Sequence, residues 1–584
     1  MPFLGGVAQL VRAPACHAGG RGFESRRSRS LYAATALAAA AALLVAAPAS
    51  AAVDPAEQPP FDGEPIPALV APDRLDRPPP GFELSAADAI AIAAETGQVR
   101  AEGGAATLRP TAATRGEDRW EVRFRDDDGE VRALIVIDDR AGEVVEAWTG
   151  NQIETKLARG YEDAIAGDLN EAWIWIPLCI LFVAPFFDFR RPFRLLHLDL
   201  LVLLGFSVSL FFFNRGDIDA SVPLVYPVLG YLFARMLLAG FRRHETRDRL
   251  LPVARRSWLL AAIAVLVVFR IGFEVVEGKV IDVGVAGTIG ADRLLAGDDV
   301  YGADFSAELP ASGDVRGDVY GPVNYLAYAP FELAFPWSGE WDDVPAARAA
   351  ALAFDLLTAL ALFALGRRLR ETEEGTTLGV ALAFAWLAYP FSLYALGSSF
   401  NDSLVALSVV AALFVLSSAP ARGALSALSG LTKFGSLALA PLLAAGRGDR
   451  RPRTVAIFAA SFFATAAIVT VPLLPDGGFR ELYDRSAGYQ ASRGSPFSIW
   501  SLEPSLEPLQ TATKVFAVAL GIAVFFVPRR RTVPQVAALA AAVLIAVQVT
   551  ATHWFYPYAV WFAPLVLVAL FAAQRGPEPV VDRP

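Results

Sequence analysis

The chain has 584 residues, of which 54% are hydrophobic and only 19% are charged, with a mean hydropathy of +0.42. A net charge of −9 without a long basic face argues against a nucleic acid as partner. Two cysteines (Cys16 and Cys179) and four scattered histidines exclude a disulfide framework and a zinc site. The apolar residues form blocks of the roughly 20 residues that a membrane-spanning helix requires, so the sequence predicts a polytopic α-helical membrane protein.

The amino-terminal 51 residues read as segments that precede the folded protein. Residues 1–30 have no helical or strand periodicity and resemble the translation of a bacterial tRNA gene, which predicts a misassigned start; a genuine basic leader is the alternative. Residues 31–51 follow several arginines with an alanine- and leucine-rich run that ends in Ala49-Ser50-Ala51, typical of a signal peptide cleaved before Ala52. An uncleaved signal anchor would leave the topology downstream unchanged.

A small α+β domain is predicted at residues 81–150, after a proline-rich acidic linker at 54–80. Ser85, with Asp88 three residues later, predicts a capped helix over Ala86–Glu95. Strands are predicted at Arg119–Arg125, Val131–Ile137 and Glu143–Trp148, the first because Trp120, Val122 and Phe124 alternate with charged residues. The W-x-V-x-F…D…G-x-V pattern resembles a PepSY-type domain, which implies a binding or modulating module.

Eleven membrane spans are predicted from the apolar blocks, and basic linkers fix their direction. The linkers FDFRRPFR, RRHETRDR, RRLRETEEG, GRGDRRPR and PRRR all fall on one side, which the positive-inside rule assigns to the cytoplasm. The amino-terminal domain is then outside a bacterial cytoplasmic membrane and the carboxyl terminus is inside. The spans are 173–189, 196–213, 222–241, 257–275, 350–366, 377–395, 403–418, 454–474, 511–527, 533–550 and 554–573.

Two further apolar segments do not fit this alternation as spans. Residues 323–337 are short and both of their ends must lie outside, which predicts a helix on the outer surface. Residues 424–445 contain the polar break GLTKFG and are flanked by basic linkers, so we expect two half-helices that enter from the cytoplasm. Broken backbone at such a depth is tolerated only where protein buries it.

Polar motifs recur on the predicted outer side, beginning in a long acidic loop at 276–349. This loop holds Asp282, the segment Gly290-Ala-Asp-Arg-Leu-Leu-Ala-Gly297 followed by Tyr301, and the segment Tyr320-Gly-Pro-Val. Later motifs are Asn401-Asp402, Lys433 in the broken segment, RGSPFSIW from Arg493, and HWFY from His553. In order and topological side these motifs resemble GT-C-fold glycosyltransferases, most of all the polyprenol-phosphate-mannose-dependent enzymes of glycosyltransferase family 87. The family's Y-P-P-L segment appears here as Tyr320-Gly321-Pro322-Val323, which is a departure.

The resemblance covers residues 257–573 and treats the three spans at 173–241 as accessory. It implies an inverting membrane glycosyltransferase that moves a mannose-like hexose from a polyprenyl-phosphate donor to a lipid or glycan acceptor outside the cytoplasm. No cofactor besides this lipid-linked donor is implied, no metal ligands are predicted, and dependence on a divalent metal is left open. Asp282 is the expected catalytic residue. The expected substrate-binding residues are Arg270, Asp292, Tyr320, Asn401, Asp402, Lys433, Arg485, Arg493, His553 and Tyr556.

Elementary chemistry agrees with these roles. A carboxylate at the membrane surface can deprotonate an acceptor hydroxyl, and nearby cations stabilise a departing phosphate. Each residue also has a plainer reading: Asp282 as a solvated loop carboxylate, Lys433 as a cation that ties two half-helices together, and His553 and Tyr556 as members of an interfacial aromatic belt. Two functions of other classes compete with the enzyme, a transporter and a sensor that uses the PepSY-like domain.

Overall fold

The structure is a computed structural model that describes residues 69–574, apart from eleven short gaps. The predicted leader, the signal peptide, most of the linker and Arg493 lie outside the described residues. The gaps are 117, 128–130, 150–152, 154–155, 157–166, 215–217, 243–245, 247, 302–316, 341–342 and 493–496.

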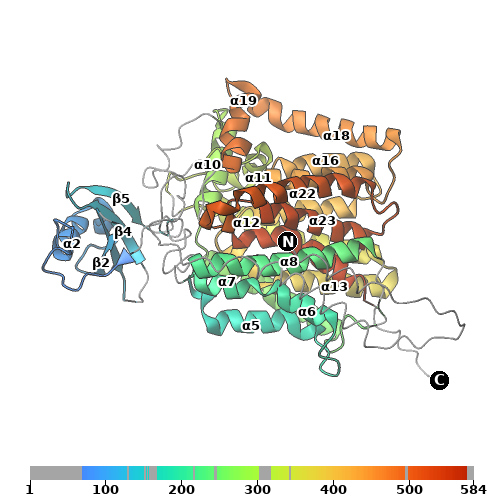
Figure 1. The fold of residues 1–584 in the computed structure, drawn as a ribbon, viewed down its shortest axis with the longest axis horizontal. Coiled ribbons are helices and arrows are strands. Elements are labelled where there is room, and N and C mark those ends of the chain that lie inside the picture. Colours follow the sequence, from blue (N-terminus) through green and yellow to red (C-terminus); the bar gives the residue numbers. More distant parts are fainter. Residues whose placement is uncertain are drawn as a thin grey trace, which may run out of the picture. The chain divides into compact units, whose positions relative to one another are not determined.

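The amino-terminal domain is a five-stranded antiparallel sheet in the order β1-β2-β3-β4-β5, accompanied by two helices (Figure 1). Ser85 and Asp88 form the predicted capping box at the start of α2. The three predicted strands are confirmed as β3, β4 and β5, whereas β1 and β2 carry no alternating pattern and were not predicted. The elements are β1 (Leu69–Val70), α2 (Ala86–Ala94), α3 (Gly97–Ala101), β2 (Arg109–Arg115), β3 (Arg119–Arg125), β4 (Val131–Asp138) and β5 (Val144–Thr149).

Strand β3 is buried on both of its faces. Trp120, Val122 and Phe124 pack with α2 in one core. The alternate residues Glu121 and Arg123 are also buried, and Arg123 Nε donates to Glu121 Oε1 at 2.8 Å. The charged residues that alternate with the apolar ones are therefore paired with each other inside the domain.

The remainder of the described chain is helical. Its loop helices are α10 (Asp282–Ala296), α11 (Pro322–Glu332), α19 (Gly478–Tyr483), α20 (Tyr489–Ser492) and α21 (Ile499–Leu502). Its other helices are α5 (Ala172–Val183), α6 (Leu195–Leu203), α7 (Phe206–Phe213), α8 (Ile218–Phe241), α9 (Arg256–Val276), α12 (Pro345–Leu369), α13 (Thr372–Ala388), α14 (Pro390–Gly397), α15 (Asp402–Phe414), α16 (Ala419–Gly430), α17 (Ala440–Ala445), α18 (Pro452–Thr470), α22 (Glu507–Phe526), α23 (Val533–Thr550) and α24 (Ala559–Phe571).

Seven helices of the described chain are long and apolar enough to cross a membrane, and an eighth span results if α13 and α14 are joined. Pro390 disfavours helical geometry at Tyr389, and the two helices are bent by 55° there. Three of the eleven predicted spans are shorter apolar helices instead: Ala172–Phe186, Asp402–Phe414 and Tyr556–Phe571. Helices of this length extend only about 20–24 Å, less than the roughly 30 Å of a bilayer core, so eleven full spans are not shown.

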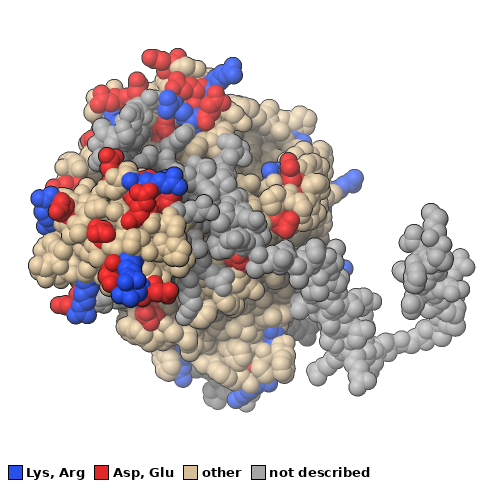
Figure 2. Space-filling view, turned by 60° about the vertical axis from the view of Figure 1, so that its left-hand side comes forward, with Lys and Arg blue, Asp and Glu red and all other residues tan. Residues whose placement is uncertain are grey.

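The chain is a polytopic helical membrane protein. Apolar side chains such as Val265 and Val268 on α9, and Phe463 and Ile468 on α18, are exposed on the outside of the helices, as contact with lipid requires. On the face that Figure 2 shows, charged side chains gather in patches and leave broad uncharged surface between them.

The helices end in two sets of connections, for which we use two names. The loop end holds the long connections at 277–344 and 474–506. The linker end holds the short basic connections at 187–194, 446–451 and 528–531. The segment predicted as a surface helix forms α11, at the loop end. The segment predicted as two half-helices forms the end of α16 and the pair η5 (Phe434–Leu439) with α17, separated at Leu431–Lys433.

Helices α5 to α8 are joined to the rest of the bundle through aromatic contacts. The ring of Trp175 on α5 lies edge-on to Phe391, and Phe206 on α7 stacks on Trp554. Helix α8 lies along α23, where Gln535 donates to the carbonyl of Gly240. These helices, which the sequence left without a role, are thus an integral part of the bundle.

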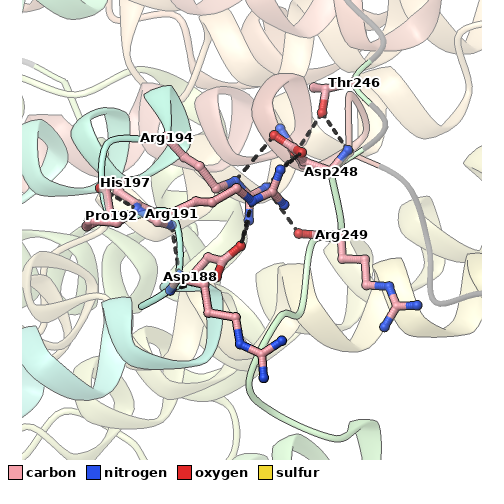
Figure 3. Close-up of polar contacts among 10 residues, drawn as sticks. Asp188, Arg191, Pro192, Arg194, His197, Thr246, Asp248 and Arg249 are labelled. Carbon is pink, nitrogen blue, oxygen red and sulfur yellow. Dashed lines mark hydrogen bonds and ion pairs between the residues drawn. The ribbon is translucent and has the colours of Figure 1, made fainter.

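Polar contacts hold the same helices at the linker end (Figure 3). Arg191 bridges Asp188 and Asp248 at 3.1 and 2.7 Å. Arg194 Nη2 donates to the carbonyl of Arg249 and to Gln574, close to the end of α24. His197 Nε2 accepts a hydrogen bond from the backbone N–H of Asp188, and Nδ1 lies 2.8 Å from the carbonyl oxygen of Pro192. The α5–α6 connection is therefore fastened to the α8–α9 connection and to the carboxyl end of α24.

Candidate active site at the loop end

The start of α11 rests on the break between α16 and η5. The backbone N–H of Val323 donates to the carbonyl of Leu431 at 3.1 Å, and that of Gly321 to Thr432 at 3.4 Å. A Cβ at position 321 would overlap the carbonyl oxygen of Leu431. Glycine at 321, the departure from Y-P-P-L, allows this close approach of two backbones.

Lys433 lies in this break, within a cage of aromatic rings. Its Nζ is 2.9 Å from Asp402 Oδ2 and 5.5 to 5.8 Å from the ring centres of Tyr320, Tyr558 and Trp561. Trp561 Nε1 donates to the other oxygen of Asp402 at 2.6 Å. The Asp402 side chain is fully buried, whereas that of Lys433 is 12% exposed. The pair is therefore electrically compensated, with the cation on the more accessible side.

Beside this pair lie buried polar atoms that have no hydrogen-bond partner among the described residues. Asn401 Nδ2 donates to Asn324 Oδ1 at 2.7 Å, which leaves Asn401 Oδ1 and Asn324 Nδ2 unpartnered. The hydroxyl of Tyr328, one turn beyond Asn324 on α11, is unpartnered as well. Buried polar atoms usually bind protein or ordered water, so these three are available to polar groups of a substrate.

Asp282 is the first residue of α10 and is half-buried. Its Oδ1 accepts the backbone N–H of Val283 at 2.9 Å. Helix α10 packs closely on α11, where Gly287 faces the ring of Tyr328 and Gly290 that of Tyr325. The first turn of α10 also approaches the carbonyl of Ser399, two residues before Asn401.

Glu274 is a buried acid of this region that sequence reasoning missed. It lies in the last turn of α9, and Ser399 Oγ donates to its Oε1 at 2.6 Å. Its Oε2 is buried and unpartnered, against Gly278 in the connection that leads to Asp282. The only signal in the sequence was a carboxylate, one turn after Arg270, inside a largely apolar block.

The connection before α11 carries the remaining polar groups of the site. Arg485 Nη1 binds Asp318 Oδ2 at 2.9 Å and its Nε binds Glu481 at 2.9 Å. Tyr301 donates to the carbonyl of Tyr320, and Tyr325 to that of Gly317. Burial raises the pKa of both tyrosine hydroxyls well above the ordinary value, so they remain protonated donors. Arg485 and Tyr320 are thus connected through the short segment 317–320.

Asp292 lies further along α10 and is half-buried. Burial raises the pKa of Glu332 on α11, and the charge of Asp292 adds to that rise. The two acids therefore lie near one another across the contact between α10 and α11.

Arg270 and Tyr556 occupy different surroundings from the other predicted residues. Arg270 is fully buried, bound to Asp355 at 2.9 Å, to the carbonyl of Leu387 and to Ser392. The hydroxyl of Tyr556 lies 2.7 Å from Ser209 and 2.9 Å from Ser221, on α7 and α8. Both side chains bind other helices of the bundle.

His553 lies beside the Lys433 cage. Its ring neighbours those of Phe497, Phe555 and Tyr558, and Tyr558 is one wall of the Lys433 cage. The structure brings together Tyr320, Asn401, Asp402 and Lys433. Arg485 is connected to Tyr320 through segment 317–320, and Asp282 and Asp292 lie on α10, which packs on α11. Arg270 and Tyr556 bind other parts of the bundle. Among the described residues, no group of three or more His, Cys, Asp or Glu side chains is arranged to hold a metal ion.

These features define a helical membrane protein with a polar site where its long loops converge. Residues 319–495 match the family model of glycosyltransferase family 87. The matched segment contains Tyr320, Asn401, Asp402, Lys433 and Arg485; Asp282 and Arg270 precede it, and His553 and Tyr556 follow it. No curated protein and no solved structure matches the chain. The region similar to glycosyltransferase family 87 therefore lies in the carboxyl-terminal half of a polytopic membrane protein.

Proposed function

We propose that the protein transfers a mannose-like hexose from a polyprenyl-phosphate donor to a lipid or glycan acceptor at the loop end, on the extracytoplasmic side. The observation that carries this proposal is the caged Lys433–Asp402 pair beside the unpartnered atoms of Asn324, Asn401 and Tyr328. A fixed cation suits the phosphate of a lipid-linked donor, and unpartnered amide and hydroxyl groups suit the hydroxyls of a sugar.

Asp282 is the proposed general base. Its carboxylate takes the proton of the acceptor hydroxyl as the acceptor oxygen bonds to the anomeric carbon. The bond from that carbon to the phosphate oxygen breaks at the same time, and polyprenyl phosphate leaves with the electron pair. Attack from the face opposite the phosphate inverts the anomeric centre.

Lys433, Arg485 and Arg493 are proposed to stabilise the negative charge that develops on the departing phosphate. The surroundings of Lys433 support this role, because three aromatic faces hold its ammonium group in place while part of the side chain stays accessible. Tyr320, Asn401, Asp402, Asp292 and His553 are proposed to shape the substrate pocket. For Arg270 and Tyr556 we propose a supporting role behind it.

The finer topology is part of the same proposal. All eleven apolar segments cross or enter the membrane, the linker end faces the cytoplasm, and the loop end and amino-terminal domain face outward. The basic connections at the linker end support this orientation. The amino-terminal domain acts as a PepSY-like binding module, for which its buried sheet core offers a stable scaffold.

The proposal is tested with the purified protein and synthetic polyprenyl-phosphate mannose, glucose and galactose. Sugar transfer is followed by mass spectrometry with short mannoside acceptors, and the anomeric configuration of the product by NMR. We expect transfer from one donor with inversion, together with a marked loss of rate in Lys433→Met. A matched Lys514→Met variant, on α22, should behave as wild type. Transfer at the same rate by both variants would contradict the assigned site.

A further inference from the structure

Two arginine-rich connections meet at the linker end, remote in sequence from one another. The backbone N–H of Arg531 donates to the carbonyl of Arg447 at 3.3 Å, and Arg450 Nη1 donates to the carbonyl of Phe526. Gly448 has a φ of +108° and lies against the carbonyl of Arg529, where a Cβ would overlap it. The connection 446–451, which continues into the first residues of α18, and the connection 528–531 are therefore held together by their backbones.

The charges of these connections are not balanced. They carry a single acid, Asp449, and its carboxylate accepts from the backbone and side chain of Arg451 and from Thr454. The arginines are Arg447, Arg450, Arg451, Arg453, Arg529, Arg530 and Arg531. The Asp449 carboxylate therefore binds residues of its own segment and not the arginines at 529–531.

Arg531 is the buried member of this cluster. Only 2% of it is exposed, and Nη2 donates to the carbonyl of Phe525 at 3.3 Å. Its Nε and Nη1 are buried without a hydrogen-bond partner. Burial lowers the pKa of Arg531 to about 10, and the nearby charge of Arg450 contributes to the same effect. Within the described residues, Arg531 thus has a cationic neighbour and no acidic one.

A buried cation without a counter-ion is unfavourable, because burial removes hydration that no opposite charge replaces. A bound anion would supply the missing acceptor to both nitrogens. Helix α23 begins two residues later, at Val533, and its amino-terminal dipole adds to the positive field. The neighbouring Phe526 and Val527 are exposed and apolar, as expected of residues beside lipid.

We propose that Arg531 and Arg450 form a phosphate-binding site at the linker end, separate from the glycosyl-transfer site. Its ligand is a phosphate group, carried either by an anionic phospholipid headgroup or by a free phosphate in solution. This site is independent of the proposed sugar transfer and its residues lie on the opposite ends of the helices.

The site is tested by thermal unfolding of the full-length protein under two conditions. In detergent, inorganic phosphate is titrated; in nanodiscs, phosphatidylcholine is compared with a mixture that contains phosphatidylglycerol. The variant is Arg531→Gln, and the matched control is Arg530→Gln, which removes the same charge from an exposed neighbour. Stabilisation by inorganic phosphate assigns a free ligand, and stabilisation by phosphatidylglycerol alone assigns a lipid headgroup.

We expect Arg531→Gln to raise the ligand concentration at half-saturation at least about tenfold, because it removes a charged hydrogen bond to the anion. The value for Arg530→Gln should stay close to that of the wild type. Without the anion, Arg531→Gln should be no less stable than wild type. Should Arg531→Gln fail to fold, Arg450→Gln is expected to show the same tenfold loss of affinity for the anion. Equal weakening by Arg530→Gln and Arg531→Gln, or no stabilisation by either ligand, would overturn the proposal.

Discussion

Arg270 and Lys433 are both buried cations of the helical bundle, and their neighbours give them different roles. Arg270 is enclosed completely, with its guanidinium bound to a carboxylate, a carbonyl and a hydroxyl. Lys433 has one carboxylate, three aromatic faces and some access to solvent. We therefore propose that Arg270 contributes to stability and that Lys433 contacts the substrate.

Removal of Arg270 tests the first of these assignments. Arg270→Leu leaves Asp355 buried and uncompensated, so we expect a loss of about 3–5 kcal/mol in unfolding free energy. The double variant Arg270→Leu/Asp355→Leu removes both charges and should recover most of this loss. Denaturant unfolding in mixed micelles measures both. A double variant as unstable as the single one would contradict a role confined to the ion pair.

Glu146 gives the amino-terminal domain a predictable response to acid. Burial alone would raise the pKa of its carboxyl, but the charges of Lys156 and Arg115 outweigh it and lower the pKa to about 2. A lowered pKa stabilises the fold above the unfolded value of 4.5, and this contribution is lost as the pH falls towards 2. We expect hydrogen exchange of Val144–Thr149, corrected for intrinsic rate, to rise in that range. Glu146→Gln should exchange faster already at neutral pH, unlike the exposed Glu143→Gln.

At the scale of elements, the sequence was informative wherever a local pattern exists. The capping box at Ser85, the alternation in β3 and the apolar blocks predicted α2, three strands and most long helices. Strand β2 reads RPTAATR, and its place in the sheet depends on pairing with β3 rather than on its own pattern. Two contacts of the site join segments that are far apart in the chain: Tyr320 with Lys433, and Glu274 with Ser399. No local sequence pattern predicts such contacts.

The contact of α11 with the broken segment gives a prediction for one element. Gly321→Ala places a Cβ on the carbonyl oxygen of Leu431 and should force the start of α11 away from Lys433. We expect at least about a tenfold loss of transfer rate, since small displacements of binding groups are costly. Gly272→Ala on α9 is the control, because its Cβ would meet no atom within 4 Å. Equal rates for the two variants would refute the structural role of this contact.

At the scale of the molecule, the proposed orientation is tested by labelling from one side. Ser338 is exposed at the loop end and Glu371 at the linker end. In a Cys179→Ala background, an impermeant maleimide should label Ser338→Cys in intact cells and Glu371→Cys only after permeabilisation. Labelling of both positions from the same side would contradict the alternating topology.

If the loop end performs the sugar transfer with Asp282 as its base, the turnover number must depend on this carboxylate. The substitution keeps the size of the side chain and removes the proton acceptor, so kcat should fall by about 10²–10⁴. Asp298→Asn, on the exposed turn that follows the same helix, should retain normal turnover and normal insertion. Near-normal kcat for a folded Asp282→Asn enzyme would show that Asp282 is not the base and direct the search to Asp402 or Asp292.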